Sequence, residues 1–165
     1  ARAAPPSVEP RPVLWYEGRA FSGAKSDYED LSLEFGTPAL GSAFSVAFTA
    51  RWDGLQKWSR IIDFGNGPGE NNIFIGNRGH YDTLVFHVWL GKTEFAVQAH
   101  QAIVLGHTRR YLCTVTSQGH MRIFQDGKLL AENEKGAAPA MGARKHMFLA
   151  RSNWDRDAPF HGHIA

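Results

Sequence analysis

The stretch "RIIDFGNGPGENNIFIG", residues 60–76, places a glycine-rich loop between two apolar runs. Five of its side chains carry oxygen donors: Asp63, Asn66, Glu70, Asn71 and Asn72. Calcium takes about six to eight hard oxygen ligands, so this set is chemically adequate for that ion. The donors follow no spaced ligand pattern, and the loop has neither the phosphate-binding G-x-x-x-x-G-K-[ST] motif nor a following helix. A plain connecting turn is the preferred interpretation. The alternatives are a loop that contacts a ligand and a calcium site at Asp63, Asn66, Asn71 and Asn72.

A second stretch, "RSNWDRDAPF" at residues 151–160, surrounds a tryptophan with polar side chains. An indole ring stacks on the apolar face of a sugar, and polar neighbours accept hydroxyl protons. Trp58 is similar in kind, and Trp89 lies in a strand whose opposite face is predicted to face the core. Packing inside the protein is the preferred interpretation of these aromatic residues. The residues that we predict to contact a ligand, if they are exposed, are Trp58, Trp89, Asn153, Trp154 and Asp155.

The sequence contains no arrangement typical of a hydrolase. Retaining glycosidases need two close carboxylates, often in an E-x-D-x-E pattern, which does not occur here. The nearest carboxylate pairs, which we interpret as surface groups, are Asp27 with Glu29, Glu132 with Glu134, and Asp155 with Asp157. There is no G-x-S-x-G motif, and the pair His161 and His163 has no third zinc ligand that the sequence identifies. We therefore expect no catalytic residues and no enzymatic activity.

Composition and charge exclude several other classes. The formal net charge of the 165 residues is +2, and Lys and Arg are scattered, which argues against a nucleic-acid partner. No apolar run approaches the ~20 residues of a membrane span. The only cysteine, Cys113, lies in the apolar run "YLCTV" and is predicted to be a small buried side chain.

The elements that must position these residues are predicted to be strands. In "FSVAFTARW", residues 44–52, apolar side chains alternate with others, the period of a strand with one face on a core. Similar runs recur along the chain at residues 59–64, 72–76, 83–90, 93–99, 109–116, 120–132, 146–153 and 160–165. Gln118-Gly119 and Asp126-Gly127 indicate tight hairpin turns, because glycine accepts a positive φ. About nine or ten strands with short turns predict an all-β sandwich or jelly roll.

The order of three motifs resembles a known family. The segment "SDYEDLSLEFGTPALGSAFSVAFTARWDGLQKWSRIIDFGNG" is similar to the opening of a laminin G-like domain of the concanavalin A-like lectin/glucanase superfamily. "RRYLCTVTSQGHMRIFQDGKLLAE" resembles that family's central hairpins, and "MFLARSNWDRDAPFHGHIA" its last motif. The resemblance covers about residues 26–165. The family pattern then continues with an Asp and one more strand, so either the sequence is incomplete or this strand is missing.

The resemblance implies a two-sheet antiparallel jelly roll used for binding. We expect an extended proline-rich arm at residues 1–13 and one laminin G-like domain at residues 14–165 that lacks the family's closing strand. Members bind glycans or proteins through rim loops, sometimes with calcium, and are extracytoplasmic, either secreted or in an organelle lumen. The predicted function is a non-catalytic module that recognises a glycan or protein partner. The alternative is a structural subunit docked in a larger assembly, which the proline-rich arm favours.

Overall fold

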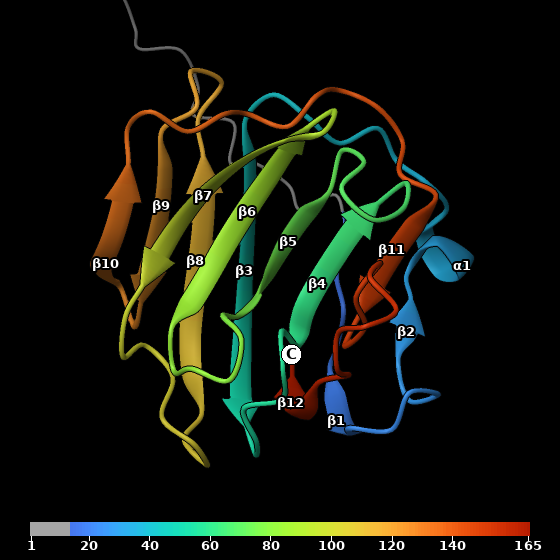
Figure 1. Cartoon of the computed structure of the whole chain (residues 1–165), viewed down its shortest axis with the longest axis vertical. Helices are drawn as coiled ribbons and strands as arrows, with labels where there is room; N and C mark the ends of the chain where they lie inside the picture. Colours follow the sequence, from blue (N-terminus) through green and yellow to red (C-terminus); the bar gives the residue numbers. More distant parts are fainter. Residues whose placement is uncertain (1–13) are drawn as a thin grey trace, which may run out of the picture.

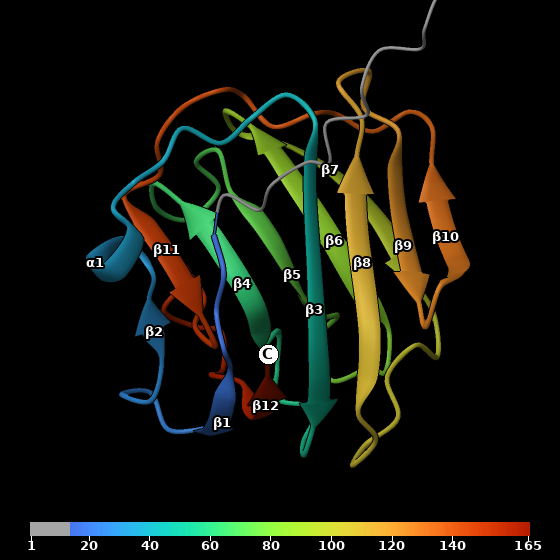
Figure 2. The ribbon, with the colours of Figure 1, turned by 180° about the vertical axis from the view of Figure 1, so that it is seen from behind.

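The computed structural model describes residues 14–165, which form two antiparallel sheets packed face to face (Figures 1 and 2). The proline-rich arm predicted for residues 1–13 lies outside the described residues. A two-sheet antiparallel jelly-roll sandwich, the predicted fold class, is confirmed. No helix in the described part of the chain is long and apolar enough to cross a membrane.

Each sheet has six strands. The first sheet has the order β1 (Arg19–Ser22), β12 (His161–Ile164), β3 (Phe44–Trp52), β8 (Arg109–Val115), β9 (Met121–Gln125) and β10 (Lys128–Asn133). The second has the order β2 (Glu29–Asp30), β11 (His146–Leu149), β4 (Arg60–Gly65), β5 (Ile73–Asn77), β6 (Leu84–Leu90) and β7 (Thr93–Ala99). A single helical turn, α1 (Ser32–Phe35), follows β2.

Alternating side chains of the first sheet fill the space between the layers. In β3 the inward positions Phe48, Ala50 and Trp52 are buried, as the period of two predicts. In β8 the buried positions include Tyr111 and Cys113. Burial also raises the pKa of the Cys113 thiol. The prediction of a small buried cysteine is therefore confirmed.

The second sheet is buried on both faces at its centre. Ile73 and Ile75 of β5 belong to the core between the sheets, whereas Phe74 points to the opposite, outer face and is still buried. All six residues of β4 are buried. The outer face is therefore covered, and the segment at residues 150–160 between β11 and β12, which passes beside β4 in Figure 1, supplies much of the cover.

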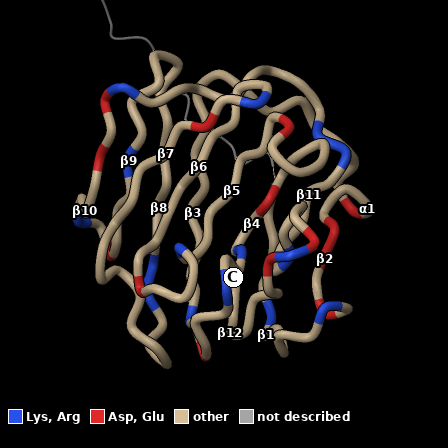
Figure 3. The backbone as a smooth tube through the Cα atoms, viewed as in Figure 1, with Lys and Arg blue, Asp and Glu red and all other residues tan. Residues whose placement is uncertain are grey.

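The tight turns lie where the sequence predicts them. Gly119 connects β8 to β9 with φ +88°, and Asp126 and Gly127 connect β9 to β10 with φ of +49° and +83°. Acidic and basic residues are interspersed over both sheets without a stripe of one sign (Figure 3). This distribution agrees with the scattered charges of the sequence.

Candidate functional site

A hollow of about 220 Å³ lies on the outer face of the second sheet. We call it the aromatic site. It is lined by Trp58, Arg60, Phe74, His87, Trp89, Glu94, Trp154 and Asp157. Four strands, the loop between β3 and β4, and the segment between β11 and β12 contribute these side chains. The volume is below the about 300–1,000 Å³ of pockets for drug-sized ligands, so it suits one small unit of a ligand.

Strand register brings residues distant in sequence together. His87 and Trp89 are two residues apart in β6, so both point to the outer face. Phe74 of β5 is the cross-strand partner of His87, and Glu94 of β7 is the partner of Trp89. Cross-strand partners on one face lie in contact distance, so the pleat itself assembles this part of the site.

The aromatic rings pack against one another and leave their outer surfaces open. The rings of Phe74 and His87 are stacked with centroids 4.3 Å apart. The Trp154 ring lies 5.8 Å from Phe74 and 5.8 Å from Trp89. Trp58, Trp89 and Trp154 are each partly exposed, whereas Phe74 and His87 are buried. The three tryptophans therefore form the accessible walls, and the two buried rings form the floor.

Arg60 provides the guanidinium beneath these walls. Only 3% of its side chain is exposed, and its Cζ lies 3.9 Å from the centroid of the Phe74 ring, a cation–π contact. Its Nη2 donates to Asp157 Oδ2 at 2.7 Å, and its Nη1 donates to the carbonyl of Trp58 at 2.6 Å. Its Nε faces Asp63 Oδ2 at 3.6 Å. Burial lowers the pKa of Arg60, and the two aspartates oppose this shift.

The interpretation of Asp157 as a surface carboxylate is wrong. Its side chain is 14% exposed, and it accepts hydrogen bonds from Arg60 and from the hydroxyl of Ser152. Burial raises the pKa of Asp157, while Arg60 and Ser152 oppose the rise. A guanidinium in direct contact favours the ionised carboxylate, so we treat Asp157 as ionised at neutral pH.

Four nitrogen atoms of the aromatic site are buried and make no well-aligned hydrogen bond in the described part of the chain: Trp89 Nε1, Arg60 Nε and both ring nitrogens of His87. Arg60 Nε faces Asp63 Oδ2 and His87 Nδ1 contacts Glu94 Oε1, which leaves Trp89 Nε1 and His87 Nε2 without a partner among those residues. The hydrogen bond from His87 lowers the pKa of Glu94, whose carboxylate is 44% exposed at the rim. Buried polar atoms are rarely left unpaired, so these nitrogens indicate a place where a ligand or water binds.

Trp58 has a backbone conformation that is rare for a large side chain. Its φ is +54°, in the left-handed region. Two hydrogen bonds hold this conformation: the Trp58 N–H donates to the Gly79 carbonyl at 2.9 Å, and the Trp58 carbonyl accepts from Arg60. Residues held in such regions cluster at functional sites, which agrees with the position of Trp58 in the site wall.

Asp63, which the sequence suggested as a calcium ligand, is wholly buried behind the aromatic site. Its carboxylate accepts hydrogen bonds from Asn72 Nδ2 at 2.8 Å and from the backbone N–H and the side-chain Nδ2 of Asn153, each at 2.9 Å. Burial raises the pKa of Asp63, and Arg60 is the main group that opposes the rise. The Asp63 oxygens therefore bind protein donors, and a guanidinium occupies the position of a neighbouring cation.

The three asparagines of the same loop also use their oxygens within the protein. Asn66 Oδ1 accepts from the Lys145 N–H, Asn71 Oδ1 from the Gly91 N–H, and Asn72 Oδ1 from the Glu70 N–H. These bonds tie the loop to its neighbours, which is what a structural turn requires. The donor set does not fit a calcium ion in this arrangement, and the calcium hypothesis stays a prediction.

The predicted ligand-binding residues divide into two groups. The structure brings Trp58, Trp89 and Trp154 together in the aromatic site. Asn153 is buried, with its Nδ2 on Asp63 and its Oδ1 2.8 Å from His146 Nδ1, so it supports the fold behind the site. Asp155 is exposed and does not line the hollow.

Sequence reasoning missed five residues of the aromatic site: Arg60, Phe74, His87, Glu94 and Asp157. One signal was present, because the alternation in β6 places His87 on the same face as Trp89. Arg60, Phe74, Glu94 and Asp157 are brought to the site by strand pairing and by the conformation of residues 150–160. No local sequence pattern predicts either of these.

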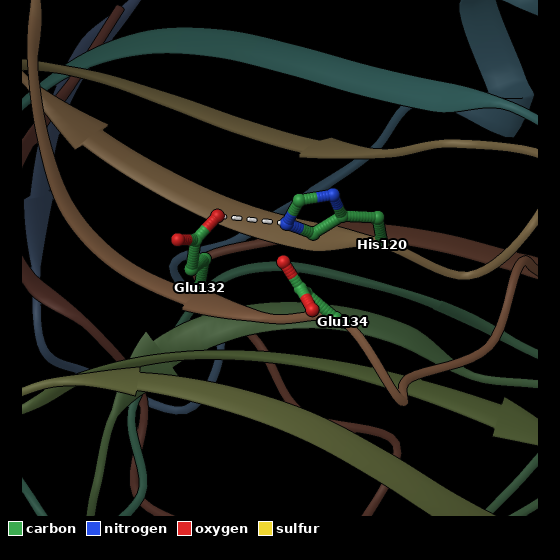
Figure 4. A group of neighbouring side chains, drawn as sticks. All are labelled: His120, Glu132 and Glu134. Atoms are coloured by element: carbon green, nitrogen blue, oxygen red, sulfur yellow. Dashed lines mark hydrogen bonds and ion pairs between the residues drawn. The ribbon is translucent and has the colours of Figure 1, made fainter.

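Two other places are weaker candidates. His120, Glu132 and Glu134 bring possible metal-ligating atoms within 4.8 Å of one another (Figure 4). The guanidinium of Arg122 donates to His120 Nε2 at 3.3 Å and lies 3.6 Å from Glu132, so its charge opposes a cation there. A hollow of about 520 Å³ on the first sheet is lined mainly by exposed residues around Arg110. Neither place carries a buried polar atom that lacks a partner in the described residues.

Solved structures share this architecture at low sequence identity. The CBM40 of a Ruminococcus gnavus IT-sialidase, bound to alpha2,3 sialyllactose, aligns with a TM-score of 0.73 and 14% identity over 92% of this chain and 89% of that chain. The LG4-5 domains of the mouse laminin alpha1 chain align with a TM-score of 0.63 and 13% identity, over 90% of this chain and 39% of that chain.

A third similar structure is domain 4 of AbnA, a GH43 extracellular arabinanase from Geobacillus stearothermophilus, in complex with arabinotriose. It aligns with a TM-score of 0.61 and 16% identity, over 77% of this chain and 61% of that chain. These identities establish the shared fold alone. No curated protein matches the chain in a sequence comparison. The profile of a protein family does match, over residues 24–165. The chain belongs to the concanavalin A-like lectin/glucanases superfamily.

Proposed function

We propose that the chain is a non-catalytic module that binds a glycan in the aromatic site. The observation that carries this proposal is the combination of three partly exposed tryptophan rings with buried, unpartnered nitrogen atoms around one hollow. A sugar has an apolar ring face and polar edges, so it complements both features at once. No step of this function requires a catalytic group.

In this proposal the side chains of the aromatic site have different roles in binding a sugar. The Trp154 ring, 5.8 Å from Trp89, provides a platform on which a sugar ring stacks. The buried, unpartnered Trp89 Nε1–H then donates to a sugar hydroxyl once the side chains that cover it move aside. The Glu94 carboxylate at the rim accepts a hydroxyl proton in return. Binding therefore satisfies a buried donor that is otherwise unpaired, which favours the bound state.

Two of the similar structures support a glycan as the ligand. One is a module bound to sialyllactose, and another is a domain in complex with arabinotriose. Both share the fold with this chain at low identity, so they support the class of ligand and not its identity. A glycan ligand also agrees with the extracytoplasmic location that we predict.

A protein partner is the second candidate, and a different surface favours it. Tyr81 is 68% exposed, and Val104 and Leu105 are 45% and 49% exposed. Their loops are joined by the hydrogen bond from the Ile103 N–H to the Asp82 carbonyl at 3.0 Å. Exposed apolar side chains on adjoining loops are typical of contact surfaces. None of these three side chains lines the aromatic site.

The first prediction is that the Trp154→Ala variant loses glycan binding. A glycan array identifies ligands of the wild-type chain, and calorimetric titration then measures the affinity of each variant for the strongest one. Removal of a central aromatic residue from an interface commonly costs more than about 1.4 kcal/mol, which is tenfold in affinity. We therefore expect at least a tenfold loss.

The matched control is Trp15→Ala, because Trp15 is 73% exposed and lies outside the aromatic site. It should bind as the wild type does. Thermal melts of both variants separate lost binding from lost folding. If Trp154→Ala folds and binds the same glycan with unchanged affinity, the aromatic site is not the binding site. If no glycan binds the folded wild type, the proposed function is wrong.

A further inference from the structure

We infer that the aromatic site selects by charge: it binds uncharged sugars and excludes sugars that carry a carboxylate or sulfate. This inference rests on the proposed function and specifies the class of ligand. It depends on the balance of charged groups that surround the hollow and on the hydrogen-bonding atoms that they leave free.

Carboxylates outnumber cations at the aromatic site. Among residues 14–165, Arg60 is the only guanidinium or ammonium group that lines it, and it already faces two carboxylates, Asp157 at 2.7 Å and Asp63 at 3.6 Å. Glu94 adds a third carboxylate at the rim, against His87. Lys57, whose carbonyl accepts from the Ala158 N–H and whose charge acts on Asp157, lies outside the hollow, so three carboxylates against Arg60 and Lys57 leave a net charge of −1 around the site. An anionic sugar would therefore be repelled at short range, where the buried surroundings screen the charges weakly.

The guanidinium is also in a poor position to bind an anion. Planar recognition of a carboxylate uses two parallel N–H groups of an arginine. In Arg60, Nη2 donates to Asp157 and Nη1 donates to the Trp58 carbonyl, and the Phe74 ring covers one face of the group. Arg60 is thus held as an internal cation that positions Trp58 and Asp157.

The free hydrogen-bonding atoms match hydroxyl groups. In the described residues, Trp89 Nε1 is a donor without a partner, and Glu94 contacts His87 through Oε1, which leaves its second carboxylate oxygen, Oε2, free to accept. A hydroxyl group both donates and accepts, so a neutral sugar can satisfy both atoms. A carboxylate only accepts, and it would leave the Glu94 oxygen without a donor while adding repulsion.

The second prediction tests this selectivity with pairs of sugars that differ only in charge. The probes are oligogalacturonides and sialyllactose as free acids, each compared with its methyl ester, beside neutral oligosaccharides on the same array. We expect neutral members of the array to bind, and any acid that binds to do so at least tenfold more weakly than its ester. If a free acid binds as tightly as its ester, or more tightly, the inference is wrong even though glycan binding is established.

A charge variant links the selectivity to one side chain. Glu94→Gln keeps the shape of the side chain and removes its charge, and it should narrow the preference for esters by several-fold. Glu34→Gln is the matched control, because Glu34 is exposed on α1, which follows β2 at the opposite edge of the sheet from β7. It changes the net charge equally and should leave the preference unchanged. An equal effect of the two variants would assign the selectivity to overall charge.

A measurement without any glycan tests the same charge balance. In a Trp15→Phe background the remaining accessible indoles are those of Trp58, Trp89 and Trp154, because Trp52 is buried. With each quencher's constant divided by its constant for free N-acetyltryptophanamide, their fluorescence should be quenched less by iodide than by caesium. Glu94→Gln should raise the iodide quenching about twofold. Quenching by iodide that equals or exceeds quenching by caesium would contradict the inference even if no glycan binds.

Discussion

One buried ion-pair network, centred on Arg60, connects the walls of the aromatic site to the interior of the protein. Arg60 contacts the ring of Phe74, the carbonyl of Trp58 and the carboxylates of Asp63 and Asp157. Burial disfavours the charged forms of Arg60, Asp63 and Asp157. The guanidinium stays charged because two carboxylates face it, and each carboxylate is stabilised by the guanidinium. The orientation of Trp58 and Trp154 therefore depends on an ion-pair network that includes Asp63, which does not line the hollow.

The third prediction is that Asp63→Asn destabilises the fold strongly. The variant removes the charge that faces Arg60 and presents an amide N–H₂ to donors from Asn72 and Asn153. Breaking a buried ion pair in this way costs about 3–5 kcal/mol. Urea denaturation at neutral pH measures the free energy of unfolding.

Asp53→Asn is the matched control for this variant. Asp53 also pairs with an arginine, Arg51, at 2.8 Å, but the pair is on the surface, where such pairs contribute little. The free energy of unfolding of this control should stay close to that of the wild type. A loss for Asp63→Asn as small as that for the control would show that the network does not depend on the buried charge.

At the scale of elements, the alternation of apolar and polar residues predicted most strands, but the sequence did not predict which strands pair with one another. The runs that became β3 to β9 show a clear period of two or a continuous apolar stretch, and both are local signals. Strands β1 and β2 were missed because four and two residues are too short to show a period. The sequence likewise predicted part of the aromatic site, because local signals identify some of its residues and not others. Its tryptophans are conspicuous in the sequence, while Arg60 and Asp157 gain meaning only when residues 97 positions apart come into contact.

Three loops at one end of the sheets are held by a single residue, Arg144. It is 2% exposed and donates to the backbone carbonyls of Asn71, Ala140 and Gly142 at 3.2, 2.8 and 2.6 Å, and also to that of Leu40. Burial lowers the pKa of this guanidinium. Backbone carbonyls replace water around the cation, so the loops and Arg144 stabilise each other.

The fourth prediction is that Arg144→Met loses about 2–6 kcal/mol of unfolding free energy, because the Asn71 and Ala140 carbonyls are left without donors at about 1–3 kcal/mol each, whereas the Leu40 and Gly142 carbonyls keep each other's backbone N–H. Lys145→Met is the control. Lys145 is exposed, and the hydrogen bond that it contributes to the loop uses its backbone N–H, which the variant keeps. Hydrogen exchange should show faster opening of the loops around residues 40 and 71 in Arg144→Met. Protection equal to the wild type in those loops would contradict the role of Arg144.

In the whole molecule, the inner face of the second sheet forms part of the core, whereas its outer face carries the aromatic site. The inner face, with Ile73, Ile75 and Phe86, is sealed against the first sheet. The outer face carries the aromatic site on strands that the core already fixes. The order of strands in each sheet, with β12 between β1 and β3, joins distant parts of the chain and could not be derived from local patterns. The fold class was available from the sequence, but the face on which the site lies was not.

The fifth prediction is that calcium does not stabilise the chain. A ligand that binds only the folded state at a hundredfold its dissociation constant adds about 2.7 kcal/mol. At about 2–4 °C per kcal/mol, this would raise the melting temperature by several degrees. Because Asp63, Asn66, Asn71 and Asn72 use their oxygens within the protein, we expect melts in calcium and in chelator to coincide. A rise of several degrees in calcium would instead support the metal site that the sequence suggested.

The segment that carries Trp154 is fastened to the sheet on both sides of that residue. Asn153 donates to Asp63, and Asp157 accepts from Arg60. A ligand that arrives therefore finds the wall in its final position and has no closing movement to wait for. Under the proposed function, association rates should then be similar for different neutral sugars, set by diffusion and orientation, and these sugars should differ mainly in their dissociation rates.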